Sequence, residues 1–211
     1  FDNVLKTIDV ENTQREIIER LGRAMEHDGQ GSNHIVRMSA MAEVMGCGIG
    51  MNENDVRLLK HAIPLHDVGN SRVPVTILRK TEPLTEDDVF AIRQHAEFGY
   101  QILKDSSRPT IQLAATLARQ HHERWDGKGY PEGLQGQAIL LQSRIATLLD
   151  VFDALINTRP YKTAWPLDKV EKVINEERGR HFDPQLVDYL LNHIEKFMAI
   201  QHQHPDIPEY V

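Results

Sequence analysis

Hydrophobic residues recur every three or four positions along most of this chain, a spacing that places them on one face of an α-helix. Alternation of the kind that indicates β-strands is scarce, and no internal repeat is visible. The pattern therefore predicts an all-α fold, a single-domain helical bundle. The expected helices cover residues 11–27, a segment from 33 onward, 55–68, 85–103, a segment around 111–122, 143–156, 167–177 and 184–198.

Turn and capping residues mark where several of these helices begin and end. Ser32 or Asn33 is placed to cap the helix that follows a glycine-rich turn. Thr85 starts a capping box in which Asp stands where Glu is usual. Pro64 predicts a kink within the 55–68 helix, and Gly69 is placed to stop it.

The same signals suggest how the chain is divided. We expect residues 1–27 to form a connector and first helix, residues 28–200 to form the main domain, and residues 201–211 to form a frayed tail. Because the chain begins with Phe1 rather than Met, we expect it to be a fragment. The first helix would then be the end of a connector from an upstream domain.

Composition and charge limit the functional classes. The chain has 211 residues, a net charge of −7 at pH 7 and one cysteine, Cys47. No apolar run approaches the roughly 20 residues that a membrane span needs, and a lone cysteine is typical of a reducing compartment, so we expect a cytoplasmic protein. The acidic balance argues against a long nucleic-acid groove but allows a small phosphate-bearing ligand.

Several histidines and aspartates interrupt the apolar helical faces or lie at helix ends. Any one of them could be a core residue that hydrogen-bonds to a backbone carbonyl, but a whole set is better explained by inward-facing metal ligands in a helical bundle. The set exceeds the four ligands of one zinc ion, and Asp67 has two oxygens that could bridge two ions. We therefore expect a dinuclear centre in the bundle core, suited to iron, manganese, nickel or zinc. The residues are His34, His66, Asp67, His95, His121, His122 and Asp150.

The stretch from residue 121 to 136 combines two kinds of signal. His121 and His122 end an apolar helical face, and four glycines and a proline then shape a tight loop, HHERWDGKGYPEGLQG. Taken alone, the pair could be a metal site beside a substrate pocket or two surface histidines.

Together these motifs resemble the HD-GYP phosphodiesterases, a branch of the HD metal-dependent hydrolases. The resemblance rests on His66-Asp67, the HHERWDGKGYP segment and Asp150 followed by an Arg-Pro-Tyr-Lys run, and it extends from about residue 12 to 198. It implies hydrolysis of cyclic di-GMP to pGpG, and in some members to GMP, by the output domain of a bacterial signalling protein. It also implies an upstream receiver or sensor domain. If the domain were an interaction module instead of an enzyme, its Gly129-Tyr130-Pro131 loop could meet a partner such as a diguanylate cyclase domain.

The resemblance assigns roles to individual residues. The seven histidines and aspartates would hold two metal ions, iron first among the candidates, with Asp67 as the bridging and catalytic carboxylate. Arg159 and Lys162 would grip substrate phosphate, and Tyr130 would shape the substrate pocket. Two cations a few ångströms apart would lower the pKa of a water and polarise the phosphoryl oxygens.

Two positions depart from the family pattern. Gln30 stands where many members carry a glutamate that supports a third metal ion, so two ions are expected. Asn70 stands where the family usually has a lysine near the leaving oxygen. Slow hydrolysis or a preference for pGpG would follow. The rival interpretation is a degenerate domain that binds metal and dinucleotide as a sensor or interaction module.

For several other charged residues the sequence leaves two possible roles open. Arg37, Lys128 and Arg144 could assist catalysis or belong to a solvated surface. Glu123 and Asp126 could support the ligands or simply be loop acids. The remaining histidines are expected to be structural or exposed: His27, His61, His181, His193, His202 and His204.

Overall fold

The computed structural model describes residues 13, 16–22, 33–158 and 163–206. Helices joined by short loops make up most of this part of the chain, which contains no β-strand and only two isolated β-bridges. The all-α expectation is confirmed. Residues 16–22 are helical, and the later elements are α2 (His34–Gly48), α3 (Glu53–Ala62), 3-10 turns Ile63–Leu65 and Val68–Arg72, α4 (Val75–Leu78), α5 (Glu86–Leu103), α6 (Pro109–Gln120), a 3-10 turn Gly136–Ala138, α7 (Leu141–Ile156), α8 (Leu167–Glu176), α9 (Pro184–Asn192) and α10 (Ile194–Gln203).

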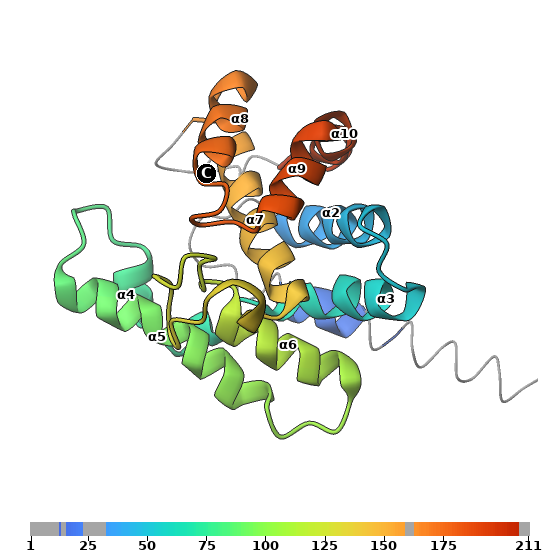
Figure 1. Cartoon of the computed structure of the whole chain (residues 1–211). Helices are drawn as coiled ribbons and strands as arrows, with labels where there is room; N and C mark the ends of the chain where they lie inside the picture. The colour runs from blue at the N-terminus through green and yellow to red at the C-terminus, as the bar shows by residue number, and fades with distance from the viewer. Residues whose placement is uncertain (1–12, 14–15, 23–32, 159–162, 207–211) are drawn as a thin grey trace, which may run out of the picture.

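Helix α7 runs through the middle of the molecule, with α5 and α6 on one side and α8, α9 and α10 on the other (Figure 1). Its apolar face is fully buried at Ile145, Leu148, Leu149 and Phe152. Phe152 meets Phe197 of α10 edge to face, with the ring centroids 6.2 Å apart. Burial of these side chains is the main favourable contribution to folding, and it makes α7 the common wall between the two halves.

Several predicted helix ends match the structure. Thr85 and Asp88 form the expected capping box at the start of α5. Asn33 is the N-cap residue of α2, although its side chain makes no capping hydrogen bond. Helix α6 ends at Gln120, and His121 is its C-cap residue.

The helix expected over 55–68 is divided. Regular α-helix ends at Ala62, and Pro64 lies in a 3-10 turn that leads to His66. A proline ring has no N–H and clashes with the preceding turn, which explains why the α-helix stops here instead of kinking. The break turns the chain so that His66 and Asp67 face the molecular interior.

Gly69 does not stop a helix, contrary to expectation. It lies inside the 3-10 turn Val68–Arg72, where a Cβ atom would come within 1.9 Å of the His95 carbonyl oxygen and 2.6 Å of the Gly99 nitrogen. The missing side chain lets this turn lie directly on α5. Close backbone approach, rather than helix termination, is the physical reason for glycine at this position.

The C-terminal helix is also divided, and it ends later than expected. His193 separates α9 from α10, and α10 continues to Gln203. The expected domain boundary at residue 200 therefore falls inside a helix. Residues 204–206 follow α10 and contact the start of α2, as Asn33 donates to the Pro205 carbonyl and to Asp206.

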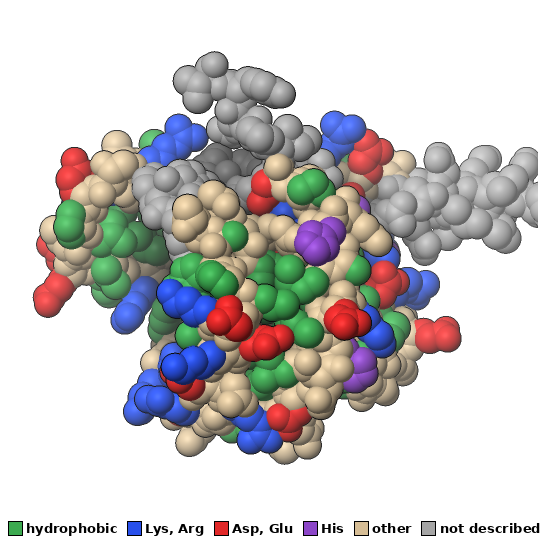
Figure 2. Space-filling model, turned by 90° about the horizontal axis from the view of Figure 1, so that it is seen from above, with side chains coloured by type: hydrophobic (Ala, Val, Ile, Leu, Met, Phe, Trp, Pro, Cys, Tyr) green, Lys and Arg blue, Asp and Glu red, His purple; other side chains and the backbone are tan. Residues whose placement is uncertain are grey.

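No helix in the described ranges is long and apolar enough to cross a membrane. On the face that Figure 2 shows, acidic and basic side chains are interspersed around apolar ones. Such a surface differs from the continuous basic groove that long nucleic acids require.

Candidate metal centre

Three of the seven predicted ligands lie in helices and four lie in turns, and all seven meet in the interior. They form two groups, and within each group the potential ligand atoms all lie within 4.8 Å of one another. One group contains Asp67, His95, His121 and His122, and the other contains His34, His66 and Asp150. His34 begins α2, His95 lies in α5, the histidine pair follows α6, and Asp150 lies in α7.

Backbone carbonyls orient three of the imidazole rings. The Nδ1 atom of His66 lies 2.8 Å from the Ile63 carbonyl oxygen, and that of His95 lies 2.7 Å from the Ile92 oxygen. The Nδ1 atom of His121 lies 3.0 Å from the Leu117 and Ala118 carbonyl oxygens. A carbonyl can only accept, so Nδ1 carries the proton in each ring. The Nε2 atoms are left as ligand atoms.

The distance between two of these Nε2 atoms indicates that a cation belongs between them. His95 and His121 bring their Nε2 atoms to 3.2 Å. Because both rings use Nδ1–H toward a carbonyl, both Nε2 atoms carry lone pairs in the neutral form, and two lone pairs so close repel. A proton or a metal ion between them removes the conflict.

The two carboxylate oxygens of Asp67 face different histidines. Its Oδ1 atom is 3.4 Å from His95 Nε2 and 3.3 Å from His121 Nε2. Its Oδ2 atom is 3.6 Å from the Nε2 atom of His66, which belongs to the other group. A carboxylate placed in this way can give one oxygen to each of two ions.

Buried atoms in the group of His34, His66 and Asp150 include ones with no hydrogen-bond partner among the described residues. Examples are His66 Nε2 and Asp150 Oδ1. A buried polar atom without a partner costs about 1–3 kcal/mol, so such atoms are rare unless something binds them. Nitrogen and carboxylate donors in this ratio suit a divalent transition metal, and the residues present fit such an ion.

Burial sets the protonation of most of these rings. It lowers the pKa of His66, His95 and His122, which keeps the three imidazoles neutral and able to bind metal. Burial also opposes charge on His121, but its hydrogen bond to Asp67 and the charge of that carboxylate outweigh burial, so the pKa of His121 is raised. A metal ion at the Nε2 atom of His121 would therefore compete with protonation of this ring.

Glu123 holds the loop that follows the histidine pair. Its buried carboxylate accepts hydrogen bonds from the backbone nitrogens of Glu132, Gly133 and Leu134, at 2.7, 3.1 and 3.0 Å. Glu123 is more than a simple loop acid, because its carboxylate fixes the loop backbone. Among the contacts described it is not a direct partner of a ligand side chain. Asp126 likewise serves the loop, since it accepts from Arg124.

Tyr130 lies against His122 and near His95. The Tyr130 ring stacks on the His122 ring with centroids 4.8 Å apart. The guanidinium of Arg93, a residue of α5, lies 5.0 Å from the centroid of the Tyr130 ring. Burial raises the pKa of the Tyr130 hydroxyl, which therefore stays protonated and can donate a hydrogen bond. Arg93 had no signal in the sequence, because an exposed arginine on a helix is ordinary.

Asp153 is a residue beside the candidate centre that the sequence reasoning missed. It is buried, and its Oδ2 atom lies 2.8 Å from Nδ1 of His34. A carboxylate behind a ligand histidine fixes the ring and raises its basicity. The only signal was its place on the buried face of α7, one turn after Asp150.

Arg37 does not belong to a solvated surface. It is fully buried and binds Asp153 through two nitrogens, at 2.6 and 2.9 Å. Arg144 is largely buried as well and pairs with Asp183 at 2.5 Å. Lys128 is exposed, as the surface interpretation expected.

Three residues singled out from the sequence, Gln30, Arg159 and Lys162, lie outside the described residues. Asn70 is described: it is buried, and its backbone N–H donates to the Asp67 carbonyl oxygen at 2.9 Å. Of the other histidines, His193 bonds to the Tyr189 carbonyl and His181 stacks on Phe182, which are structural roles. His27 also lies outside the described residues.

Comparison with known proteins identifies relatives of this chain. The HD domain family matches residues 13–186. The chain is 45% identical, over 87% of its length, to the cyclic di-GMP phosphodiesterase response regulator RpfG of Xanthomonas campestris pv. campestris, and covers 49% of that protein. It is 37% identical, over 98% of its length, to 3'3'-cGAMP-specific phosphodiesterase 2 of Vibrio cholerae, and covers 40% of it.

The fold is similar to that of a solved structure. A cyclic GMP-AMP specific phosphodiesterase of V. cholerae, V-cGAP3, superposes with a TM-score of 0.67 at 21% sequence identity, over 92% of this chain and 54% of the other. At this identity the likeness concerns the fold alone. The chain spans about half the length of each of these relatives or less.

Proposed function

The chain belongs to the HD domain family, in its HD-GYP branch, and from this premise we propose that it is a metal-dependent phosphodiesterase that hydrolyses cyclic di-GMP to pGpG. The observation that carries the proposal is the arrangement of Asp67, whose two oxygens face ligand histidines of two different groups. A phosphodiester anion repels hydroxide, so its hydrolysis needs cations that offset both charges. We propose that the domain is the output unit of a longer signalling protein with a receiver or sensor domain.

We propose that two divalent ions bind, one to each ligand group, with iron preferred. His34, His66 and Asp150 would hold one ion, and His95, His121 and His122 the other, with Asp67 shared between them. When bound, the two ions supply charge neutralisation at the phosphate and a water of lowered pKa. The protein's own part is to hold the ligand rings in place, through the backbone carbonyls behind His66, His95 and His121.

Substrate contacts are proposed beside the centre. Tyr130 stacks on His122 and has a protonated hydroxyl, and we propose that it bounds a substrate pocket next to the group of Asp67, His95, His121 and His122. From the family resemblance we propose that Arg159 and Lys162 bind phosphate, since a guanidinium gives two parallel hydrogen bonds and an ammonium a point charge.

An anaerobic turnover assay tests the proposal. Protein reconstituted with iron, and separately with manganese, should convert cyclic di-GMP to pGpG. Chromatography of the reaction mixture measures this conversion. The relative that covers 98% of this chain is named for 3'3'-cGAMP, so that dinucleotide is assayed in parallel, and pGpG is assayed as a linear substrate. If metal-loaded protein binds cyclic dinucleotides but cleaves none of them, the proposed phosphodiesterase activity is contradicted and the sensor interpretation is supported.

We expect Asn70→Lys to raise the turnover of cyclic di-GMP. Asn70 lies one 3-10 turn after Asp67, where a lysine would add a cation and a proton donor near the leaving oxygen. General acid assistance contributes roughly 10²- to 10⁴-fold in rate, and part of it, about tenfold or more, should be gained. Steady-state kinetics on cyclic di-GMP and pGpG, with metal content determined alongside, measure the effect.

Asn70→Met is the matched control, because methionine is similar in length to lysine but has no charge. A gain with Lys but not with Met assigns the effect to the cation. If Asn70→Lys raises turnover of cyclic di-GMP and lowers that of pGpG, Asn70 is an adaptation to the linear substrate. Unchanged rates for both substrates would show that this position takes no part in catalysis.

A further inference from the structure

A chain of buried and partly buried contacts connects His34, a proposed metal ligand, to residues 204–206. The first contact is between His34 Nδ1 and Asp153 Oδ2, at 2.8 Å. Asp153 is 2% exposed, and Asn157 one turn later donates to its Oδ1 atom at 3.1 Å. The ring orientation of His34 therefore depends on a carboxylate that is itself held by other groups.

Arg37 is the second member of this chain of contacts, and all of its donors are used. Its Nε and one terminal nitrogen bind the two oxygens of Asp153, at 2.6 and 2.9 Å. Its terminal nitrogens also bind the two oxygens of Asp206, at 2.8 and 3.2 Å, and the His204 carbonyl oxygen at 2.9 Å. An arginine has five N–H donors, and these five contacts leave it no freedom to turn.

Asp206 is the third member, and it acts on His34 by a second route as well. Its Oδ1 atom accepts from the backbone nitrogen of Asn33 at 3.0 Å, and the Asn33 side chain donates to the Pro205 carbonyl at 2.7 Å. Asn33 directly precedes His34, the first residue of α2. Residues 204–206 thus fix the backbone that carries His34 and the guanidinium that holds Asp153.

We propose that residues 204–206 control the affinity of the His34, His66 and Asp150 group for its metal ion, with Asp206 as a positioning residue that acts through Arg37 and Asp153. The proposal rests on the proposed metal centre. Whatever displaces these three residues from the start of α2, including a domain that follows them, would loosen one ion and leave the other bound.

The effect should be confined to one ion because the contacts reach only one ligand group. His95 and His121 are oriented by carbonyls of their own helices, at Ile92 and at Leu117 and Ala118. None of these contacts involves α2 or the C-terminal segment. A general loss of fold stability, in contrast, would lower the binding affinity for both ions together.

Manganese titration of the metal-free protein tests the proposal. The wild type should take up two ions in two binding steps. Calorimetry measures the affinity of each step, and the electron paramagnetic resonance signal of a coupled pair reports that both ions are bound. Outer carboxylates behind ligand histidines contribute about 10- to 100-fold in metal affinity, so Asp153→Asn should weaken one step by that factor. Asp206→Ala, two contacts further away through Arg37, should weaken the same step several-fold. His34→Ala identifies the step.

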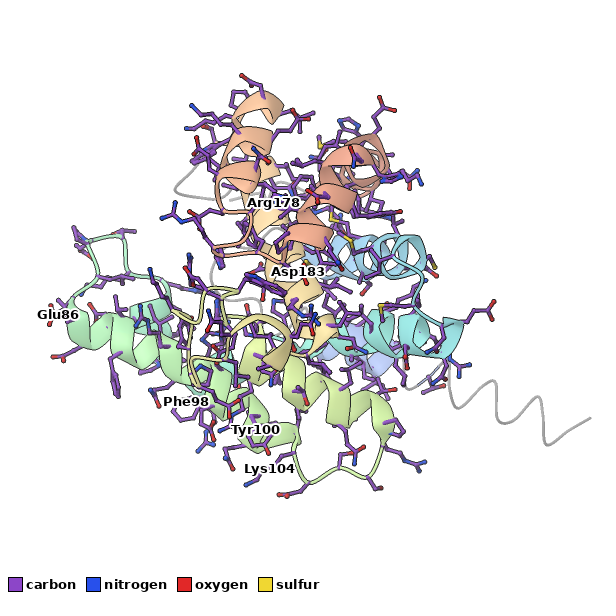
Figure 3. The ribbon with its side chains drawn as sticks, in the orientation of Figure 1. Glu86, Phe98, Tyr100, Lys104, Arg178 and Asp183 are labelled. Carbon is purple, nitrogen blue, oxygen red and sulfur yellow. The ribbon has the colours of Figure 1, made fainter. Side chains whose placement is uncertain are left out.

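Asp188→Ala is the matched control. Asp188 binds Arg178 through both oxygens at 2.7 Å, an aspartate–arginine pair of the same kind. Arg178 lies near α8 and α9 (Figure 3) and contacts no ligand histidine among the contacts described. Both steps should keep wild-type affinity in this variant. Equal weakening of both steps in Asp206→Ala, or of neither, would overturn the proposal.

A measurement without metal separates this proposal from the proposed function. The Nδ1 proton of His34, hydrogen-bonded to a buried carboxylate, should give a downfield proton resonance in the metal-free protein. Asp206→Ala should shift or broaden that resonance, and Asp188→Ala should not. An unchanged resonance in Asp206→Ala would overturn the role of residues 204–206 even if the metal centre is correct. A wild type that binds no metal would refute the proposed function and, with it, the control of metal affinity. A resonance still sensitive to Asp206 in that protein would leave only the positioning of His34 by residues 204–206 intact.

Discussion

Asp67→Ala is expected to remove most of the bound metal and to abolish measurable turnover of cyclic di-GMP. Both oxygens of Asp67 lie within 3.3 to 3.6 Å of ligand nitrogens, and they face both groups. A carboxylate shared by two ions would bind each of them and offset part of the repulsion between them. The loss in metal affinity should therefore exceed the roughly 10- to 100-fold that changes behind a ligand produce.

Elemental analysis and chromatographic turnover of the reconstituted protein measure this effect. The wild type should hold about two ions per chain, a stoichiometry that also tests Gln30, since a reproducible third tight ion would refute the argument made from its neutral amide. Asp188→Ala should retain both ions. Retention of both ions by Asp67→Ala would mean that this carboxylate does not bridge them.

Gly69→Ala should destabilise the fold and disrupt the metal centre together. An added Cβ would meet backbone atoms, the His95 oxygen at 1.9 Å and the Gly99 nitrogen at 2.6 Å, which cannot rotate away. Overpacking of this kind costs about 1–3 kcal/mol and occasionally more. We expect a loss of about 3 kcal/mol in the free energy of unfolding. The displaced turn also carries Asp67, so metal should be lost as well.

Urea unfolding of the metal-free protein, with metal titration of the folded protein, measures the two effects. Gly46→Ala is the control, because its Cβ would meet flexible side-chain atoms of Val56 and Met51 at 3.1 and 3.3 Å. Alanine also favours a helix over glycine by about 1 kcal/mol, so this variant should stay within about 1 kcal/mol of wild type. Equal behaviour of the two variants would show that the contact between the 3-10 turn and α5 is not essential.

The metal-ligand candidates could be found from the sequence because their chemistry conflicts with their positions. A histidine or aspartate on an apolar helical face is unfavourable without a partner, and His34, His95 and Asp150 each interrupt such a face. The helices were predictable for a related reason: the core face of a helix must be apolar at a fixed period, which any core of this type imposes on the sequence. Pro64 indicated an interruption of the 55–68 helix, because the steric effect of a proline ring on a helix is purely local.

The tertiary structure alone decided how the ligands divide into two groups, because the division depends on distances between helices far apart in the chain. It also decided the roles of Gly69 and Arg37. A glycine after a helix and an arginine on a helix have the same sequence appearance whether they are exposed or buried. Their roles follow from what lies against them, the His95 carbonyl oxygen in one case and Asp153 in the other. Contacts such as that of Asp206 with Arg37, 169 residues apart, have no periodic trace in a sequence, because packing determines them only after the helices have assembled.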